Sequence, residues 1–184
     1  MGGEKRESVV NFIWDNIFRQ TDKERTLTQR LRQNVLFQDL TGTELRLLEN
    51  IVNVRSYRPS ETIFRQGEAG VGMYIISKGA VNIYVEEMIN ATGELQSVPV
   101  THLSEGDFFG DLALVEENSR RSATAISAEE TVLIGFFKPA LLEIAQRNPT
   151  AGVKILLRLG EVLGRRLRET TAKITELKRE TKTT

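Results

Sequence analysis

The sequence predicts an α+β fold in which an antiparallel β-roll, a jelly-roll-like barrel, lies between N-terminal helices and a long C-terminal helix. Apolar residues recur at helical spacing before residue 52 and again after residue 138. Between these limits, short apolar runs alternate with turn signals at a spacing of roughly ten residues, which is typical of small antiparallel barrels and rolls. We therefore expect a helical segment at 1–40, the roll at 41–148 and the final helix at 149–184.

The N-terminal segment has the spacing of several short helices. Residues that share one helical face are Val9, Val10, Ile13 and Ile17. Residues 21–24 (Thr-Asp-Lys-Glu) have the spacing of a capping box and predict the start of a second helix, which carries Leu27 and Leu31. The same spacing at residues 41–44 (Thr-Gly-Thr-Glu) predicts the start of a third.

The roll is predicted from alternating short strands and turns. The expected strands include residues 62–64, 73–76, 81–85, 98–103 and 131–137, with a hairpin tip at 91–94. The glycines at 67, 70 and 72 are interpreted as a turn between strands. They do not form a dinucleotide fingerprint, because a strand and not a helix follows them.

The final helix is expected over residues 150–180, after a break at Asn148 and Pro149. Its apolar and small residues alternate at spacings of four and three, as a two-stranded coiled coil requires. This heptad seam comprises Leu156, Gly160, Leu163, Leu167, Thr170, Ile174, Leu177 and Thr181. It predicts a homodimer; the alternative is a helix packed on its own roll through Leu157, Leu159 and Val162.

Residues 106–124, here called the cassette, contain the side chains and backbone groups best suited to binding a ligand. Gly110 lets the backbone approach a ligand, and the N–H groups that follow can surround an anion. Arg121 offers a planar guanidinium to a phosphate, with the hydroxyl of Ser122 beside it. Asp111 only accepts hydrogen bonds, which suits a sugar hydroxyl; the alternative is that it caps the following turn. Together these residues indicate a nucleotide pocket.

Residues 109–114 read Phe-Gly-Asp-Leu-Ala-Leu, and residues 121–124 read Arg-Ser-Ala-Thr. This arrangement resembles the phosphate-binding cassette of the cyclic nucleotide-binding domain family, which includes the sensor domains of bacterial catabolite activators. A second signature of that family is similar to residues 67–76, Gly-Glu-Ala-Gly-Val-Gly-Met-Tyr-Ile-Ile. The resemblance covers about residues 36–180. Asp111 departs from it, since the family has Glu there, and Val71 stands where the family has Asp.

The resemblance implies a sensory module that is not an enzyme. Its ligand would be a cyclic mononucleotide, cAMP or else cGMP, with no further cofactor, and binding would change how the final helix packs. The implied ligand residues are Phe109, Gly110, Asp111, Leu112, Ala113, Arg121, Ser122, Ala123, Thr170 and Thr171. Thr170 and Thr171 would meet the base, one within the subunit and one across a dimer; alternatively, Thr170 only sets the register of the seam. The rival hypothesis is a ligand-free scaffold for protein interaction, which Asp111 and Val71 favour.

The composition of the chain excludes several other classes of protein function. Twenty-five basic and twenty-five acidic residues balance, so neither nucleic acid nor a membrane surface is an expected partner. There is no cysteine for a disulfide or a thiol nucleophile, and His102 is the only histidine, which argues against a jelly-roll metalloenzyme. The first residues lack the apolar core of a signal peptide, so the expected location is the cytoplasm.

Overall fold

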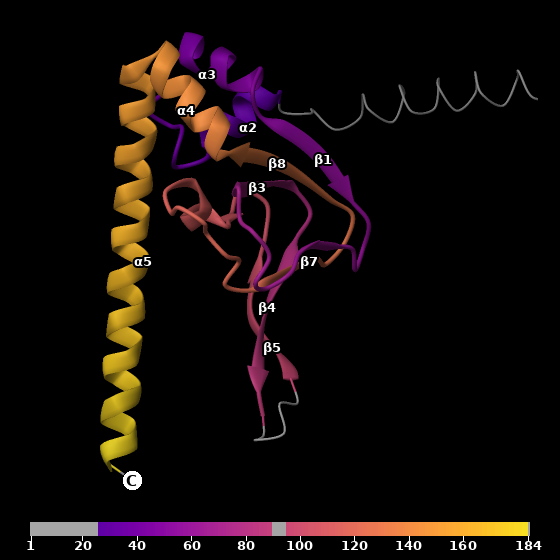
Figure 1. Ribbon diagram of the computed structural model, residues 1–184, viewed down its shortest axis with the longest axis vertical. Coiled ribbons are helices and arrows are strands. Elements are labelled where there is room, and N and C mark those ends of the chain that lie inside the picture. The colour runs from indigo at the N-terminus through magenta and orange to yellow at the C-terminus, as the bar shows by residue number, and fades with distance from the viewer. Residues whose placement is uncertain (1–25, 90–94, 184) are drawn as a thin grey trace, which may run out of the picture.

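The computed structural model describes residues 26–89 and 95–183. Figure 1 shows a β-roll covered at one end by short helices, with one long helix running along its side. The helices are α2 (Leu27–Gln33), α3 (Gly42–Glu49), α4 (Lys138–Arg147) and α5 (Pro149–Thr183), and a short 3₁₀ helix η1 spans Asp111–Leu114. The predicted α+β class with an antiparallel roll is confirmed. None of the described helices is both long and apolar enough to cross a membrane.

Two four-stranded antiparallel sheets form the roll, in the orders β1-β8-β3-β6 and β2-β7-β4-β5. The strands are β1 (Asn53–Tyr57), β2 (Thr62–Phe64), β3 (Gly72–Lys78), β4 (Val81–Met88), β5 (Leu95–Leu103), β6 (Phe108–Phe109), β7 (Thr124–Ser127) and β8 (Thr131–Phe137). Strands β2 and β8 have the expected bounds, and β3, β4 and β5 extend beyond theirs. The expected hairpin tip at 91–94 lies outside the described residues.

The N-terminal helices begin at capping boxes, one of them shifted from its predicted position. Thr41 caps α3 as expected: its hydroxyl accepts from the Glu44 N–H, and the Glu44 carboxylate accepts from the Thr41 N–H. Helix α2 is capped by Thr26 and Gln29, so the predicted start at 21–24 is wrong for the helix that carries Leu27. Thr26 has an extended backbone, with ψ of 156°, which no continuous helix can cross. The expected first helix lies outside the described residues.

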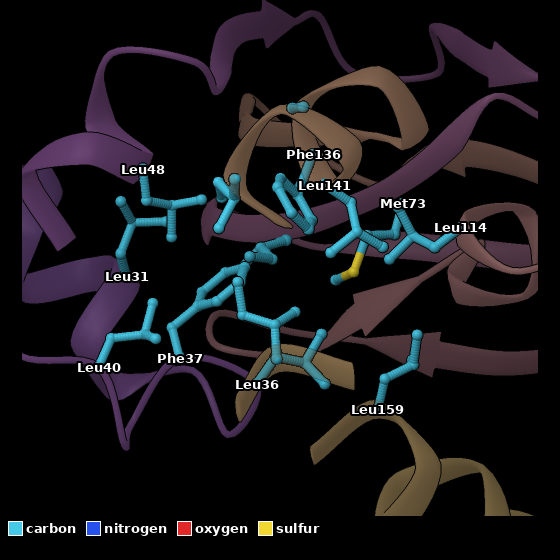
Figure 2. Close-up of a cluster of buried hydrophobic side chains, with 14 of the residues drawn as sticks. Leu31, Leu36, Phe37, Leu40, Leu48, Met73, Leu114, Phe136, Leu141 and Leu159 are labelled. Carbon is cyan, nitrogen blue, oxygen red and sulfur yellow. The ribbon is translucent and has the colours of Figure 1, made fainter. Parts of the chain in front are cut away.

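Helix α5 packs on the body of the domain through one face of its first half. Ala151, Ile155, Leu159 and Val162 are buried in the main apolar core. Figure 2 shows Leu159 at one edge of this core, which also contains Met73 of β3 and Leu114 of η1. Within this apolar core, the Phe37 ring meets the Phe136 ring edge to face, with ring centroids 5.4 Å apart.

Most of the heptad seam lies away from this buried face of α5, although Leu163 of the seam packs against the core. The seam residues Leu156, Leu167, Ile174 and Leu177 are between 42% and 68% exposed. The alternative packing predicted for this helix is therefore correct for Leu159 and Val162, which are buried, and wrong for Leu157, which is 65% exposed. Beyond the roll, the C-terminal part of α5 stands clear of the other elements in Figure 1.

Two ion pairs fix the start of α5 to the N-terminal helices. Lys154 Nζ lies 2.9 Å from the buried Glu44 carboxylate, and Arg158 forms a two-pronged pair with Asp39 at 2.6 and 3.0 Å. The hydrogen bond from Arg158 lowers the pKa of Asp39. Apolar packing and charge together therefore set the position of α5, and α5 in turn closes one side of the cavity described next.

Candidate functional site

A cavity of about 710 Å³ lies between the roll and α5. The roll contributes Phe64, Ile83, Thr101 and Leu103; the cassette contributes residues 108–113 and 119–123; and α5 contributes Leu163, Arg166, Leu167 and Thr170. Segments distant in the sequence therefore share one chamber, which has apolar walls and a few charged groups.

The cavity gathers nearly all of the residues that the sequence marked. They are Phe109, Gly110, Asp111, Leu112, Ala113, Arg121, Ser122, Ala123 and Thr170. Thr171 is not part of the cavity wall: it is exposed, and its hydroxyl donates to the Leu167 carbonyl at 2.9 Å. Thr170 donates in the same way to the Arg166 carbonyl at 2.9 Å, and its side chain is part of the cavity wall.

Gly110 is required by the geometry of the cassette. Its φ is +75°, a left-handed conformation that favours glycine. A Cβ at this position would also collide with the Arg121 guanidinium, whose Nη1 donates to the Gly110 carbonyl at 3.3 Å and to the Gly72 carbonyl at 2.8 Å. The absence of a side chain at Gly110 therefore makes room for the cation.

The glycine turn at residues 67–72 holds the backbone of Arg121, which precedes strand β7. The Gly67 N–H donates to the Arg121 carbonyl and the Arg121 N–H donates to the Glu68 carbonyl, both at 2.8 Å. The interpretation of this turn as a connection between strands is confirmed. Because it pairs with the cassette, the turn also positions the guanidinium, which its sequence alone did not indicate.

Arg121 is a buried cation that lacks a carboxylate partner among the described residues. It is only 6% exposed, and burial lowers the pKa of its guanidinium below the ordinary value. Its Cζ lies 4.1 Å from the centroid of the Phe64 ring. Its Nε has no hydrogen-bond partner. Buried charges are normally paired, so this group is suited to an anion that enters the cavity.

Asp111, in contrast, already has a partner. Its Oδ1 accepts from Arg166 Nη1 at 2.7 Å, while its buried Oδ2 has no hydrogen-bond partner. Arg166 also donates to the Phe108 carbonyl at 3.2 Å and lies over the Phe108 ring at 4.8 Å. Asp111 makes no side-chain cap of η1, so the capping alternative is wrong.

Sequence reasoning missed Arg166 as a member of the site. One signal was present: Arg166 immediately precedes Leu167 of the heptad seam, so its side chain flanks that seam. The apolar wall residues Phe64, Ile83 and Leu103 were missed as well, because each comes from a strand far from the cassette in sequence.

The cavity wall carries three arginines and one carboxylate, so its net charge is positive. Asp111 and Arg166 neutralise each other, and Arg120 is exposed, donating to the Gly67 carbonyl at 3.1 Å. One buried positive charge, that of Arg121, remains uncompensated. The site is therefore suited to a ligand with one negative charge and an apolar or aromatic portion.

The described residues offer little for metal chemistry. They contain no group of three metal-ligating side chains. His102 lies on β5, where its Nδ1 is 2.7 Å from the Asn82 side-chain oxygen. It therefore lies on a strand face, as expected, and outside the cavity wall.

Comparison with known proteins agrees with this geometry. Residues 54–148 match the sequence profile described as the cyclic nucleotide-binding domain. The chain is 29% identical over 139 residues to a cyclic AMP receptor protein of Thermus thermophilus, covering 76% of this chain and 60% of that protein. It is 34% identical over 110 residues to a cAMP-dependent protein kinase regulatory subunit of Candida albicans, covering 60% of this chain and 22% of that protein.

A solved structure, the Thermus thermophilus catabolite activator protein, superimposes with a TM-score of 0.65 at 28% identity. The similarity covers 78% of this chain and 63% of that one. The chain thus spans less than two thirds of the receptor proteins it matches. Since the profile covers more than half of the chain, the chain belongs to the cyclic nucleotide-binding domain family.

Proposed function

We propose that this domain binds a cyclic mononucleotide, with cAMP as the expected ligand, and acts as a regulatory module without a catalytic step. The observation that carries the proposal is Arg121, a buried guanidinium with no carboxylate partner among the described residues and an unsatisfied Nε. Relatives of this chain are named for cAMP.

The charge of the site favours a cyclic phosphate over an open one. A cyclic phosphodiester carries one negative charge, whereas a phosphate monoester carries about 1.5 to 2 at neutral pH. Only one buried guanidinium is available to neutralise it, and a guanidinium can grip a phosphate through two parallel hydrogen bonds. Ser122 and Ala123 line the same part of the cavity.

Asp111 supplies the acceptor for the sugar. Its Oδ1 is engaged by Arg166, and its Oδ2 is buried and unsatisfied. Once the groups that bury Oδ2 move aside, a ribose hydroxyl would donate to it while Oδ1 keeps its bond to Arg166. The shorter side chain of Asp is therefore compatible with ribose recognition, because Arg166 fixes the direction of the carboxylate.

The same carboxylate links the ligand to α5. Arg166 belongs to α5, whereas Asp111 belongs to the cassette, so a ligand that binds Asp111 alters the group that holds α5 against the roll. Leu163, Leu167 and Thr170 form the α5 wall of the cavity, where the base would lie. We infer that ligand binding changes the packing of α5.

The exposed heptad seam of α5 supports a homodimer. Its residues Leu156, Leu167, Ile174 and Leu177 are exposed apolar side chains at seam spacing. Pairing two such seams would cover them. The dimer would also bring a second α5 close to each cavity, and this is where Thr171 would acquire a role.

One observation favours the rival function, a ligand-free scaffold. Asp111 is paired with Arg166, so the acidic group of the cassette does not require a ligand for neutralisation.

Calorimetric titration separates the two functions. The chain should be titrated with cAMP, cGMP, 5'-AMP and a cyclic dinucleotide, with Arg121→Ala as the control variant. We expect saturable binding of cAMP that 5'-AMP does not reproduce and that Arg121→Ala abolishes. A chain that binds none of the four, while remaining folded, is the scaffold.

A further inference from the structure

We propose that Phe64 is a positioning residue for Arg121: its ring holds the guanidinium, before any ligand arrives, in the orientation that receives the anion. The inference deepens the proposed function and rests on it for the identity of the anion. Phe64 ends strand β2, at the opposite edge of its sheet from β5 and far in sequence from the cassette.

The ligand-free protein has to stabilise a cation that it buries. Arg121 forms no ion pair with any described carboxylate, and its only charge-neutral partners are two backbone carbonyls and two aromatic rings. The Phe64 ring is the nearer, with Cζ 4.1 Å from its centroid, against 5.8 Å for Tyr74. The face of an aromatic ring attracts a cation most strongly where water is excluded.

The Phe64 ring is itself held in place. Its centroid lies 5.7 Å from that of Phe109 and 6.1 Å from that of Tyr74. Tyr74 and Phe109 in turn stack on each other at 5.7 Å, and Phe137 meets Tyr74 edge to face at 5.8 Å. An aromatic cluster on β2, β3, β6 and β8 thus presents one ring face to the guanidinium.

These contacts leave one part of the guanidinium available. The ring covers its face, and Nη1 is engaged by the Gly72 and Gly110 carbonyls. The buried Nε has no partner. A planar guanidinium so held cannot turn without losing either the stacking or the carbonyl hydrogen bonds, so it keeps one orientation in the cavity wall.

The consequence is preorganisation. Arginine is a long side chain, and ordering it at the moment of binding lowers affinity. Holding Arg121 against Phe64 beforehand removes part of that cost. Phe64 would then increase affinity without supplying any hydrogen bond to the ligand.

A measurement on the protein without added ligand tests directly whether the Phe64 ring holds the Arg121 guanidinium. In a ¹⁵N–¹H spectrum, the Arg121 Nε–H resonance should be displaced by the ring current of Phe64; Arg121→Lys identifies this resonance by removing it. We expect the displacement to disappear in Phe64→Leu and to remain in Phe64→Tyr, which keeps the aromatic face. An undisplaced resonance in the unmodified chain overturns the proposal.

Titration with cAMP tests the consequence. A buried cation–π contact is worth about 0.5–2 kcal/mol, so Phe64→Leu should weaken binding by about 2- to 30-fold, and Phe64→Tyr should restore it. Phe37→Leu is the matched control: it removes a buried ring that belongs to neither the aromatic cluster around Arg121 nor the cavity wall. It should lower thermal stability yet leave affinity unchanged.

Arg121→Ala, alone and combined with Phe64→Leu, shows whether Phe64 acts through the guanidinium. We expect Phe64→Leu to have no further effect once Arg121 is absent. A loss of the same size in both backgrounds means that Phe64 contacts the ligand directly, and the proposal is then wrong. If the unmodified chain binds no cyclic nucleotide while the displaced resonance is present, the proposed function fails and the positioning of Arg121 by Phe64 stands.

Discussion

Asp111 of the cassette and Arg166 of α5 form a 2.7 Å ion pair, although they lie 55 residues apart in the chain. One end of this pair is the group expected to contact the sugar of a nucleotide. The other end belongs to the helix expected to respond. A single carboxylate therefore connects the interior of the cavity with the position of α5.

The pair should be measurable in the ligand-free protein. Asp111→Ala and Arg166→Ala should each lower the free energy of unfolding, and the double variant should lose less than their sum. Because the Arg166 side chain is 45% exposed, we expect a coupling of about 1 kcal/mol. Denaturant unfolding of the four proteins gives this value, and strictly additive losses would show that the two side chains do not interact in solution.

The two adjacent arginines should differ sharply in ligand binding. Arg121→Ala should weaken cAMP binding by roughly 2–5 kcal/mol, since it removes the buried partner of the phosphate. Arg120→Ala should have little effect, because Arg120 is exposed and bonds only to the Gly67 carbonyl among the described groups. Calorimetry of both variants makes the comparison; equal losses would contradict the assignment of the phosphate to Arg121.

Arg121 should also lower the thermal stability of the protein when no ligand is bound. Arg121→Met replaces a buried cation, unpaired by any described carboxylate, with an apolar side chain of similar length. Such replacements are often neutral or stabilising. We expect the melting temperature of the ligand-free chain to stay level or rise while cAMP binding is lost, as thermal unfolding with and without cAMP would report. A large fall in melting temperature would mean that Arg121 has a structural role.

The seam should produce a parallel homodimer with a testable charge arrangement. In a parallel pair, Lys173 before Ile174 faces the partner's Lys178 after Leu177, so like charges meet. Lys173→Glu would convert two repulsive contacts into attractive ones and should tighten the dimer by about fivefold. Sedimentation at several concentrations provides the constant. A monomeric unmodified chain at micromolar concentration would contradict the dimer. If adding Leu167→Ala to Lys173→Glu removes the tightening, the two chains pair through the seam.

The ion pair between Glu44 and Lys154, which holds the start of α5, should weaken at low pH. Burial alone would raise the pKa of Glu44, but hydrogen bonds from Thr41 and the charge of Lys154 hold it below its ordinary value of 4.5. The stability that it contributes is therefore complete above about pH 4.5 and is lost as the pH falls through the lower folded-state pKa. Glu44→Gln should remove about 1–2 kcal/mol at pH 7 and less at pH 3. A loss independent of pH would exclude the ion pair as its cause.

The sequence alone determined the features that depend on neighbouring residues. The start of α3 followed from Thr41 and Glu44, because a capping box is completed within one turn of helix. The bounds of β8 followed from an apolar run between turns, and the cassette followed from the spacing of Gly110, Asp111 and Arg121. Each of these is a local pattern of hydrogen-bonding or periodicity, and such patterns can be read from the chain.

The tertiary structure decided which local patterns were used and which residues met. The capping-box spacing at residues 21–24 predicted the start of the helix that carries Leu27, but that helix begins at Leu27 with Thr26 as its N-cap. Strand β7 was not predicted; its four residues are held by the neighbouring strands β2 and β4. Arg166 and Phe64 joined the site only because folding brought α5 and β2 to the cassette.

Helix α5 shows most clearly the difference between what the local sequence determines and what tertiary packing decides. Its sequence contains two apolar stripes, and periodicity alone does not tell which one packs on the roll. The folded chain buries Leu159 and Val162 and leaves Leu167 exposed, because the rest of the core and the ion pairs of Lys154 and Arg158 fix the rotation of the helix about its axis. That rotation turns Arg166 toward Asp111, so the charge of the cavity was settled by long-range packing and not by the cassette sequence.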